Sequence, residues 1–422
     1  MAEGPRTDRP PRLILVGINY TPEVTGIAPY NAMLAEWLVQ NGWDVEVITT
    51  FPYYPAWKKI PGDAGKLYRR EEMEGVTVHR LWHYVPARVT ALRRMIHEAT
   101  FLMGAFLRLV TLRRADVLFL VSPPLPLGLL GWIYRFFFRR PAVFHVQDLQ
   151  PDAAVGLGML KPGILIRTLY RLEAFAYRAA ARVSGISPGM IDAFHKKGVP
   201  PAKTLFFPNP VQLPDQKAIP PRGCFREAHS IPQDAFLVSY SGNLGVKQGL
   251  GQILEAAQSL RDDSSVRFII CGDGAEREKL EKSVAARGLD SVKVLPIQNM
   301  KLYHALLVDS DLCLVTQQAN SGAAFFPSKL LTLMAFARPV LATADEESAL
   351  AELFRDEQCG LLCTPNDAQS FKEAVLFARN HPKEIAHMAQ SGYQYVSRFR
   401  RRSVLTRISE KLNLLVKKRH RG

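Results

Sequence analysis

The chain has few cysteines, no long hydrophobic run and no low-complexity tract, and each absence excludes a class of protein. Its 422 residues include five cysteines, an odd number placed mostly in apolar, strand-like runs. We therefore expect reduced, buried thiols in a cytosolic protein, with no disulfide scaffold and no structural zinc at Cys359 and Cys363. The longest apolar run, residues 125–138, is interrupted by Arg135. It is shorter than the roughly 20 residues that cross a bilayer.

The polar, proline-bearing start "MAEGPRTDRPPR" has no apolar stretch, so we expect no signal peptide. Acidic residues are scarce beside basic ones, and the formal net charge of +15 predicts an anionic partner. Ten Lys or Arg and one acid occupy residues 398–422. A second basic zone flanks apolar segments, which suggests a membrane surface, although a solvated helix face over a core is the alternative for any single arginine. This zone contains Arg88, Arg93, Arg94, Arg108, Arg113, Arg114, Arg139 and Arg140.

Short apolar runs alternate with helical patterns along the chain, which predicts parallel sheets covered by helices. The first series comprises "RLILVGI", "DVEVITT", "TVHRLW", "DVLFLVS", "AVFHVQ" and "RVSGIS"; the second comprises "FLVSYSG", "VRFIICG", "VKVLPI", "LCLVT", "PVLAT" and "GLLCTP". We expect two α/β domains, residues 1–207 and 223–390, joined by a proline-rich linker over 208–222. The segment 391–422 ends in an amphipathic helix that needs a packing partner, with Val404, Ile408, Leu412 and Leu415 on one stripe.

Three glycine-rich or small-residue loops follow predicted strands, where α/β sheets bind ligands. The first contains Gly26. The second contains Gly242, Asn243, Gly245, Lys247 and Gly249, which supply amides and a cation suited to pyrophosphate. The third contains small residues 321–324 and then Pro327, Ser328 and Lys329 at a predicted helix start. A lysine in a first helical turn is unfavourable by about 0.3–1 kcal/mol unless an anion lies there, so we interpret Lys329 as a binding residue.

Taken in order, eight segments resemble the family-four retaining glycosyltransferases of GT-B fold, and most closely the branch with the colanic-acid-type exopolysaccharide enzymes. The segments are "NYTPEVTGIAPYNAMLAEWL", "TTFPYYPAW", "FHVQDLQPDAAVGLGML", "RLEAFAYRAAARVSGISPGM", "FFPNPV", "SGNLGVKQGL", "FIICGDGAERE" and "FPSKLLTLMAFARPVLAT". The resemblance covers nearly the whole chain. It implies two Rossmann-like domains facing across a cleft, with the acceptor mainly on the first and a nucleotide-sugar mainly on the second. It also implies that the C-terminal helix returns to the first domain.

The resemblance also implies roles for residues of this chain. The catalytic set is His145, Lys247 and Lys329, the lysines neutralising the departing diphosphate. Residues implied to bind the donor are Gly26, Gly242, Asn243, Gly245, Gly274, Ser321, Gly322, Ser328 and Thr332. Tyr53, Tyr54 and Asp148 are implied on the acceptor side. From the sequence pattern alone, a core histidine bonded to the backbone is the better interpretation of His145, and the aromatic loop at Tyr53 is equally a rigid proline-locked loop.

Two departures from the family pattern affect donor recognition. The Glu-x7-Glu pair before "Met-Ala" in many members is Ala324 and Thr332 here, so those glutamate roles are not carried over. The Gly-Arg-Leu common in the family is Gly242-Asn243-Leu244, which removes a phosphate-binding cation. Glu347 or Glu352 is a candidate for binding a donor hydroxyl, or simply complements a helix dipole. No clear Asp-x-Asp metal motif is expected, since Asp309-Ser310-Asp311 matches a structural element before a strand.

We therefore expect a glycosyltransferase that moves a sugar from a GDP- or UDP-sugar to a lipid-linked saccharide during exopolysaccharide assembly. The nucleotide-sugar is a substrate, and no cofactor, metal or nucleic acid is expected. The enzyme is expected in the cytoplasm, peripheral on an anionic inner membrane surface. The alternatives are a sugar-nucleotide epimerase of the same fold, which needs acid and base carboxylates that we cannot place, and a non-catalytic basic protein that binds nucleic acid.

Overall fold

The computed structural model describes residues 9–24, 26–88, 90–156, 163–215, 217, 219–319 and 327–419. It divides into two compact units. Unit 1 consists of Met1–Pro151, Met159–Pro210 and Arg402–Gly422, and unit 2 consists of Asp152–Gly158 and Val211–Arg401. The main crossover, between Pro210 and Val211, falls inside the proline-rich segment 208–222.

Unit 1 is built on an eight-stranded sheet in which the hydrophobic runs of the sequence form the central strands. In chain order the strands are β1 (Arg12–Val16), β2 (Asp44–Thr50), β3 (Tyr68–Met73), β4 (Val76–Leu81), β5 (Val117–Ser122), β6 (Ala142–Val146), β7 (Arg182–Gly185) and β8 (Thr204–Phe206). Their order across the sheet is β3-β4-β2-β1-β5-β6-β7-β8, and all neighbours are parallel except β3 and β4. Every residue of β1 and β5 is buried, because helices cover both faces of a parallel sheet.

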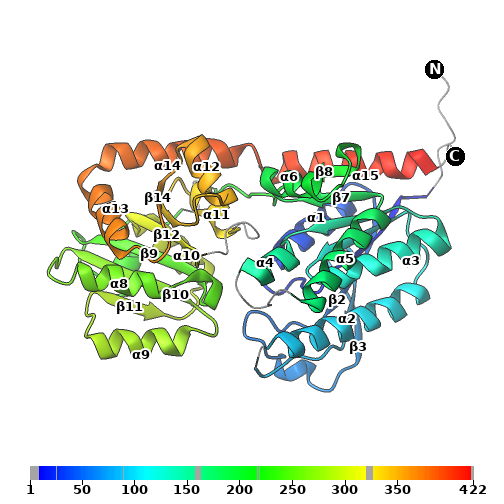
Figure 1. Ribbon diagram of the computed structural model, residues 1–422, viewed down its shortest axis with the longest axis horizontal. Coiled ribbons are helices and arrows are strands. Elements are labelled where there is room, and N and C mark those ends of the chain that lie inside the picture. Colours follow the sequence, from blue (N-terminus) through cyan, green and yellow to red (C-terminus); the bar gives the residue numbers. More distant parts are fainter. Residues whose placement is uncertain are drawn as a thin grey trace. The chain divides into compact units, whose positions relative to one another are not determined.

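The helices of unit 1 connect these strands and include the last helix of the chain. They are α1 (Ala28–Gln40), α2 (Ala91–Thr111), α3 (Gly128–Phe138), α5 (Ile164–Ala179), α6 (Pro188–Lys196) and α15 (Arg401–Arg419), while α4 (Gln150–Gly156) spans a division point between units. Of the predicted stripe of α15, Val404, Ile408 and Leu412 are buried and Leu415 is half-buried. Trp37 Nε1 of α1 donates a hydrogen bond to Ser409 Oγ at 3.0 Å, and α15 runs beside α6, β7 and β8 (Figure 1).

Unit 2 contains a six-stranded, fully parallel sheet. Its strands are β9 (Phe236–Asn243), β10 (Val266–Asp273), β11 (Val292–Leu295), β12 (Leu312–Thr316), β13 (Val340–Thr343) and β14 (Leu361–Cys363), ordered β11-β10-β9-β12-β13-β14. Its helices are α7 (Cys224–Ala228), α8 (Gly251–Ser259), α9 (Arg277–Arg287), α10 (Met300–Asp309), α11 (Lys329–Ala335), α12 (Ala349–Glu357), α13 (Ala368–Asn380) and α14 (Pro382–Ser397). The core includes Val238, Ile270 and Leu314 of three adjacent strands. All five cysteines are free, four of them buried and Cys224 partly exposed.

The strand order of each sheet indicates where a ligand is expected. In unit 1 the first strand, β1, has β2 on one side and β5 on the other; in unit 2 the first strand, β9, lies between β10 and β12. Successive strands are therefore added first on one side of β1 or β9 and then on the other side, which makes a reversal point in the strand order of each sheet. Open α/β sheets bind ligands beyond the carboxyl ends of their strands at such reversal points. The loops that follow β1 and β9 are accordingly the candidate binding loops.

Candidate active site

The loop after β9 carries the predicted glycines and has little space for larger residues. β9 ends at Asn243, a short 3-10 helix spans Val246–Gln248, and Gly249 has the left-handed φ of 56° before α8 begins. A Cβ added at Gly245 would lie 2.7 Å from Asn243 Nδ2. The structure therefore brings Gly242, Asn243, Gly245 and Lys247 into one tight turn at the reversal point of unit 2. Lys247 is half-buried, and its backbone oxygen accepts a hydrogen bond from Gln318 N at 3.0 Å.

Gly274, after β10, is fixed against the same turn. Leu244 N donates to Asp273 O at 2.8 Å, and Glu276 N donates to Leu244 O at 2.9 Å. A Cβ at Gly274 would lie 2.5 Å from Leu244 O, and its φ of +152° disfavours other residues. The glycine of "CGDG" thus lets the β10 loop approach the β9 loop, and both loops lie at the carboxyl end of the sheet.

Lys329, the first residue of α11, reaches this turn. Its Nζ atom is buried, although part of the residue is exposed, and it has no hydrogen-bond partner among the described residues. The Nζ atom lies 3.4 Å from the ring centroid of Tyr240 on β9. A Cβ at Gly242 would lie 3.6 Å from Lys329 Cδ. Burial lowers the pKa of Lys329 well below its ordinary value. A buried amine beside a glycine-rich turn has the chemistry to receive an anion.

The remaining predicted donor residues lie around the start of α11. Ser328 precedes Lys329 and Thr332 is one turn later, both half-buried. Ser321 and Gly322 lie outside the described residues. The roles of all four stay predictions.

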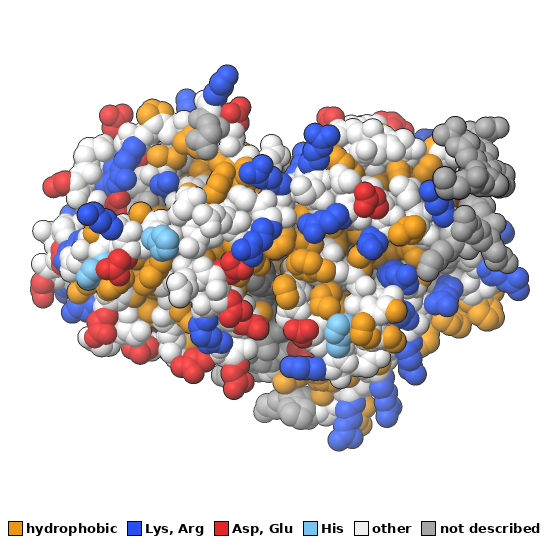
Figure 2. Space-filling view, turned by 90° about the horizontal axis from the view of Figure 1, so that it is seen from above, with side chains coloured by type: hydrophobic (Ala, Val, Ile, Leu, Met, Phe, Trp, Pro, Cys, Tyr) orange, Lys and Arg blue, Asp and Glu red, His pale blue; other side chains and the backbone are white. Residues whose placement is uncertain are grey.

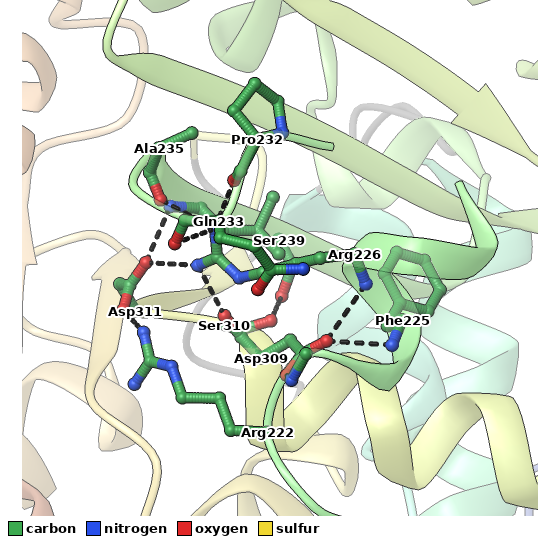
Figure 3. A network of polar contacts seen from close by, with 12 residues as sticks. Arg222, Phe225, Arg226, Pro232, Gln233, Ala235, Ser239, Asp309, Ser310 and Asp311 are labelled. Atoms are coloured by element: carbon green, nitrogen blue, oxygen red, sulfur yellow. Dashed lines mark hydrogen bonds and ion pairs between the residues drawn. The ribbon is translucent and has the colours of Figure 1, made fainter. Parts of the chain in front are cut away.

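Asp309 and Asp311 are held in a polar network at the start of unit 2 (Figure 3). Asp309 Oδ1 accepts a hydrogen bond from Gly223 N, and Oδ2 accepts from Phe225 N and Arg226 N at 2.8 and 3.0 Å. Asp311 pairs with Arg222 and with Arg226, whose Nη2 lies 2.8 Å away. The two carboxylates therefore hold α7 against the end of α10 and the start of β12.

Unit 1 places a buried glutamate in the loop after β1. Glu23 Oε1 accepts hydrogen bonds from Tyr53 N and Tyr54 N, both at 2.8 Å, and Oε2 accepts from Asn19 Nδ2 at 2.9 Å. Burial raises the pKa of Glu23 despite these bonds. The carboxylate of Glu23 therefore joins the loop after β1 to the loop after β2.

The same loops bring Gly26 and the predicted acceptor-side residues together. Gly26 has a φ of +66°, and a Cβ there would lie 3.4 Å from the Tyr54 ring. Tyr54 is half-buried; burial and then the negative charge of Asp148 raise its pKa, so Asp148 lies close to it. Tyr53 is buried, and its hydroxyl lies 3.1 Å from His97 Nε2. Of the two tyrosines, Tyr54 is the one with exposed surface for a ligand.

His145 is buried at the carboxyl end of β6, with both ring nitrogens close to polar groups. Nδ1 lies 2.9 Å from Ser184 Oγ, and Nε2 lies 2.8 Å from Gln147 Nε2, which is consistent with an unprotonated Nε2 as acceptor. The rings of Phe119 and Phe207 lie against it. Burial lowers the pKa of His145 to about 3, so the imidazole is neutral at physiological pH. The catalytic role of His145 stays a prediction.

Two contributors to these sites were missed from the sequence, Glu23 and Tyr240. Glu23 lies inside the segment "NYTPEVTG", where a polar residue is ordinary loop composition. Tyr240 lies in the apolar strand run "FLVSYSG", where an aromatic residue is ordinary core composition. The sequence signals that could have identified them were an acidic residue in an otherwise uncharged loop, for Glu23, and a position two residues before Gly242, for Tyr240.

The fold and the two loops define a class of enzyme, and comparisons with known proteins identify it. Residues 25–210 match the glycosyl transferase 4-like domain, and residues 222–395 match the glycosyl transferases group 1 domain. The chain belongs to the group 1 glycosyltransferases of family four, which adopt the GT-B fold.

Its relatives include a colanic acid enzyme. The chain is 33% identical over 349 residues to the putative colanic acid biosynthesis glycosyl transferase WcaI of Escherichia coli, covering 81% of this chain and 85% of WcaI. The fold matches sucrose-phosphate synthase of Thermosynechococcus elongatus with a TM-score of 0.75 at 18% identity, covering 97% and 100% of the two chains. It also matches Anabaena HepE, solved in complex with UDP-glucose, with a TM-score of 0.68 at 18% identity over 95% and 99%.

Proposed function

We propose that this glycosyltransferase transfers a sugar, with retention of configuration, from a GDP- or UDP-sugar to a lipid-linked saccharide in exopolysaccharide assembly on the cytoplasmic face of the membrane. The binding of the donor in this proposal rests on Lys329. Its amine is buried, and its side chain lies beside the glycine turn at Gly242. Positive charge and backbone amides placed there stabilise the diphosphate as it departs. The name of WcaI supports an exopolysaccharide acceptor, and the UDP-glucose complex of HepE supports a nucleotide-sugar donor.

The residues of each unit divide the work in this proposal. In unit 2, the turn at Gly242, Asn243 and Gly245 binds the diphosphate, with Lys247 and Lys329 as cations. In unit 1, Tyr54 and Asp148 contact the acceptor, and Gly26 lets the loop after β1 approach the donor. The nucleotide-sugar acts as a substrate without a further cofactor.

The experiment is transfer with separate donors. The enzyme is incubated with acceptor membranes and, in turn, GDP-fucose, GDP-mannose, UDP-glucose and UDP-galactose, and lipid-linked product is followed. Product with one donor, lost in Lys329→Met, supports the proposal. Product with none of the donors, together with no thermal stabilisation by UDP, GDP or ADP far above micromolar concentration, contradicts it.

The membrane half of the proposal is supported by the exposed face of α2. Five apolar side chains follow helical spacing along this helix and are between 43% and 64% exposed: Leu92, Ile96, Met103, Leu107 and Val110. No helix among the described residues is both long and apolar enough to cross a bilayer. An exposed apolar stripe flanked by arginines is typical of helices that lie in a membrane interface. Figure 2 shows Lys and Arg side chains among hydrophobic ones over part of the visible face of unit 1.

The arginines of the basic zone differ in whether they form an ion pair within the protein. Arg140 forms an ion pair with buried Asp116 at 2.9 Å, so its charge is engaged within unit 1. Arg113 and Arg139 have no ion pair among the described residues. Flotation with anionic vesicles should weaken in Met103→Asp/Leu107→Asp and in Arg113→Glu/Arg139→Glu. The control, Ile297→Asp, removes an equally exposed apolar side chain from unit 2. Unchanged flotation in both double variants would rule out this surface.

A further inference from the structure

The side chain of Lys329 has an unusual setting for a cation. Its Nζ atom is buried and faces the ring of Tyr240 at 3.4 Å from the centroid, with no hydrogen-bond acceptor among the described residues. Gly242 has no side chain, and a Cβ there would lie 3.6 Å both from Lys329 Cδ and from Tyr240 Oη, so the turn leaves room beside the lysine side chain. An anion in this turn is therefore within reach of the lysine.

Among the residues that the structure describes, the titratable groups that face Lys329 do not compensate a positive charge before an anion arrives. They are Tyr240 on β9 and Cys313 on β12. Burial raises the pKa of Cys313, so this thiol is neutral at physiological pH. Burial lowers the pKa of Lys329 itself. A buried ammonium without a counter-charge is costly, and such a lysine loses its proton instead.

Tyr240 is held in place independently of Lys329. Its hydroxyl donates a hydrogen bond to Asn243 O at 2.8 Å, and its backbone pairs with Ile270 of β10. The ring therefore forms a fixed surface between the sheet and the glycine turn. An aromatic face attracts an ammonium group and imposes little penalty on a neutral amine, so it suits a lysine that changes charge.

We propose that Tyr240 is a positioning residue that holds Lys329 beside the glycine turn, and that Lys329 takes up a proton when a nucleoside diphosphate binds. This rests on the proposed function, because it takes the diphosphate site as given. The proton comes from solvent and bonds to the lone pair of Nζ. The resulting ammonium donates to the phosphate oxygens, and the new ion pair keeps the proton in place.

Calorimetry of UDP and GDP binding tests both parts. Titrations at pH 8 in Tris and in HEPES, which differ in ionisation enthalpy, give the protons taken up per nucleotide. At this pH the terminal phosphate is already ionised, so it contributes little. We expect uptake of up to one proton for the wild type, because the new ion pair raises the Lys329 pKa that burial lowers. We expect none for Lys329→Arg, which stays charged, and none for Lys329→Met, which binds about 10- to 100-fold more weakly.

Two variants separate positioning by the ring from support of the fold. Tyr240→Phe keeps the ring and should bind with nearly wild-type affinity and proton uptake. Tyr240→Leu removes the ring and should bind about 2- to 30-fold more weakly. Wild-type binding without proton uptake, or uptake that persists in Lys329→Met, would overturn the proton step and leave the proposed function standing. Equal affinity of Tyr240→Leu and wild type would overturn the positioning role. Failure of the wild type to bind any nucleotide would instead contradict the proposed function.

Discussion

Replacing Lys329 by methionine should make the empty protein more stable while weakening nucleotide binding. Methionine has nearly the length of lysine and no polar end group, so it fills the same space against Tyr240. The wild-type protein buries Nζ without a hydrogen-bond partner among the described residues. Such burial costs about 1–3 kcal/mol, and a neutral amine gains little from the Tyr240 ring in return, because the ring attracts a cation. The expected gain is therefore at least about 1 kcal/mol, or about 2–4 °C in Tm for a domain of this size.

The gain depends on pH with a definite sign. Burial holds the folded-state pKa of Lys329 below the ordinary value of 10.5 that applies in the unfolded chain. Between these two values the unfolded chain binds one more proton, so wild-type stability rises with pH. The methionine variant lacks this titration. Its advantage is therefore largest below the lowered pKa and shrinks as the pH approaches 10.5.

Urea unfolding of both proteins at pH 7 and pH 9.5 measures this difference. Lys301→Met is the matched control, because Lys301 is an exposed lysine of unit 2 and its replacement should change stability little. A lower free energy of unfolding for Lys329→Met than for the wild type at pH 7, or an advantage that stays the same at both pH values, would refute the reasoning.

Three further substitutions test the contacts that shape the two units, each by urea unfolding. Glu23→Ala leaves the amides of Tyr53 and Tyr54 without their acceptor and should destabilise unit 1 by about 1–3 kcal/mol; a loss below about 0.5 kcal/mol would contradict this. Gly274→Ala places a methyl group 2.5 Å from Leu244 O and should cost about 1–3 kcal/mol, with weaker UDP binding. A variant as stable as the wild type would contradict this, because the loops after β9 and β10 would then move apart without cost. Arg226→Met removes a buried guanidinium of α7 that bonds Asp311 and several carbonyls, and should cost about 3–5 kcal/mol; Arg267→Met, a partly exposed arginine of β10 in the same unit, is the control.

The central strands and their loops could be predicted because each is encoded locally. All twelve strand runs expected from the sequence are present. The two strands missed lie at the edges of unit 1: β3, with the sequence YRREEM, alternates exposed and half-buried residues, and β8 has three residues. β3 has no apolar face to detect, and it exists because it pairs antiparallel with β4. An edge strand takes its stability from its neighbour, which a local pattern does not contain.

The candidate site also contains residues that could be predicted from the sequence and contacts that could not. Gly26, Gly242 and Gly245 were predicted, since glycine loops after apolar runs are visible in the sequence, and Gly274 was implied by the family resemblance. Lys329 was predicted from its conflict with a helix start. That its amine faces Tyr240, 89 positions earlier, could not be predicted, because β9 and α11 meet only through the folded sheet.

The sequence by itself determined the alternation of strand and helix, the glycine turns and the family, because these depend on residue type and spacing along the chain. Only the tertiary structure decided that the Lys329 amine is buried with no hydrogen-bond partner among the described residues, that Glu23 binds the loop after β2 and that Asp309 and Asp311 hold α7. Charge state and hydrogen bonding depend on solvent exclusion and on distances in space, and neither is a property of neighbours in sequence.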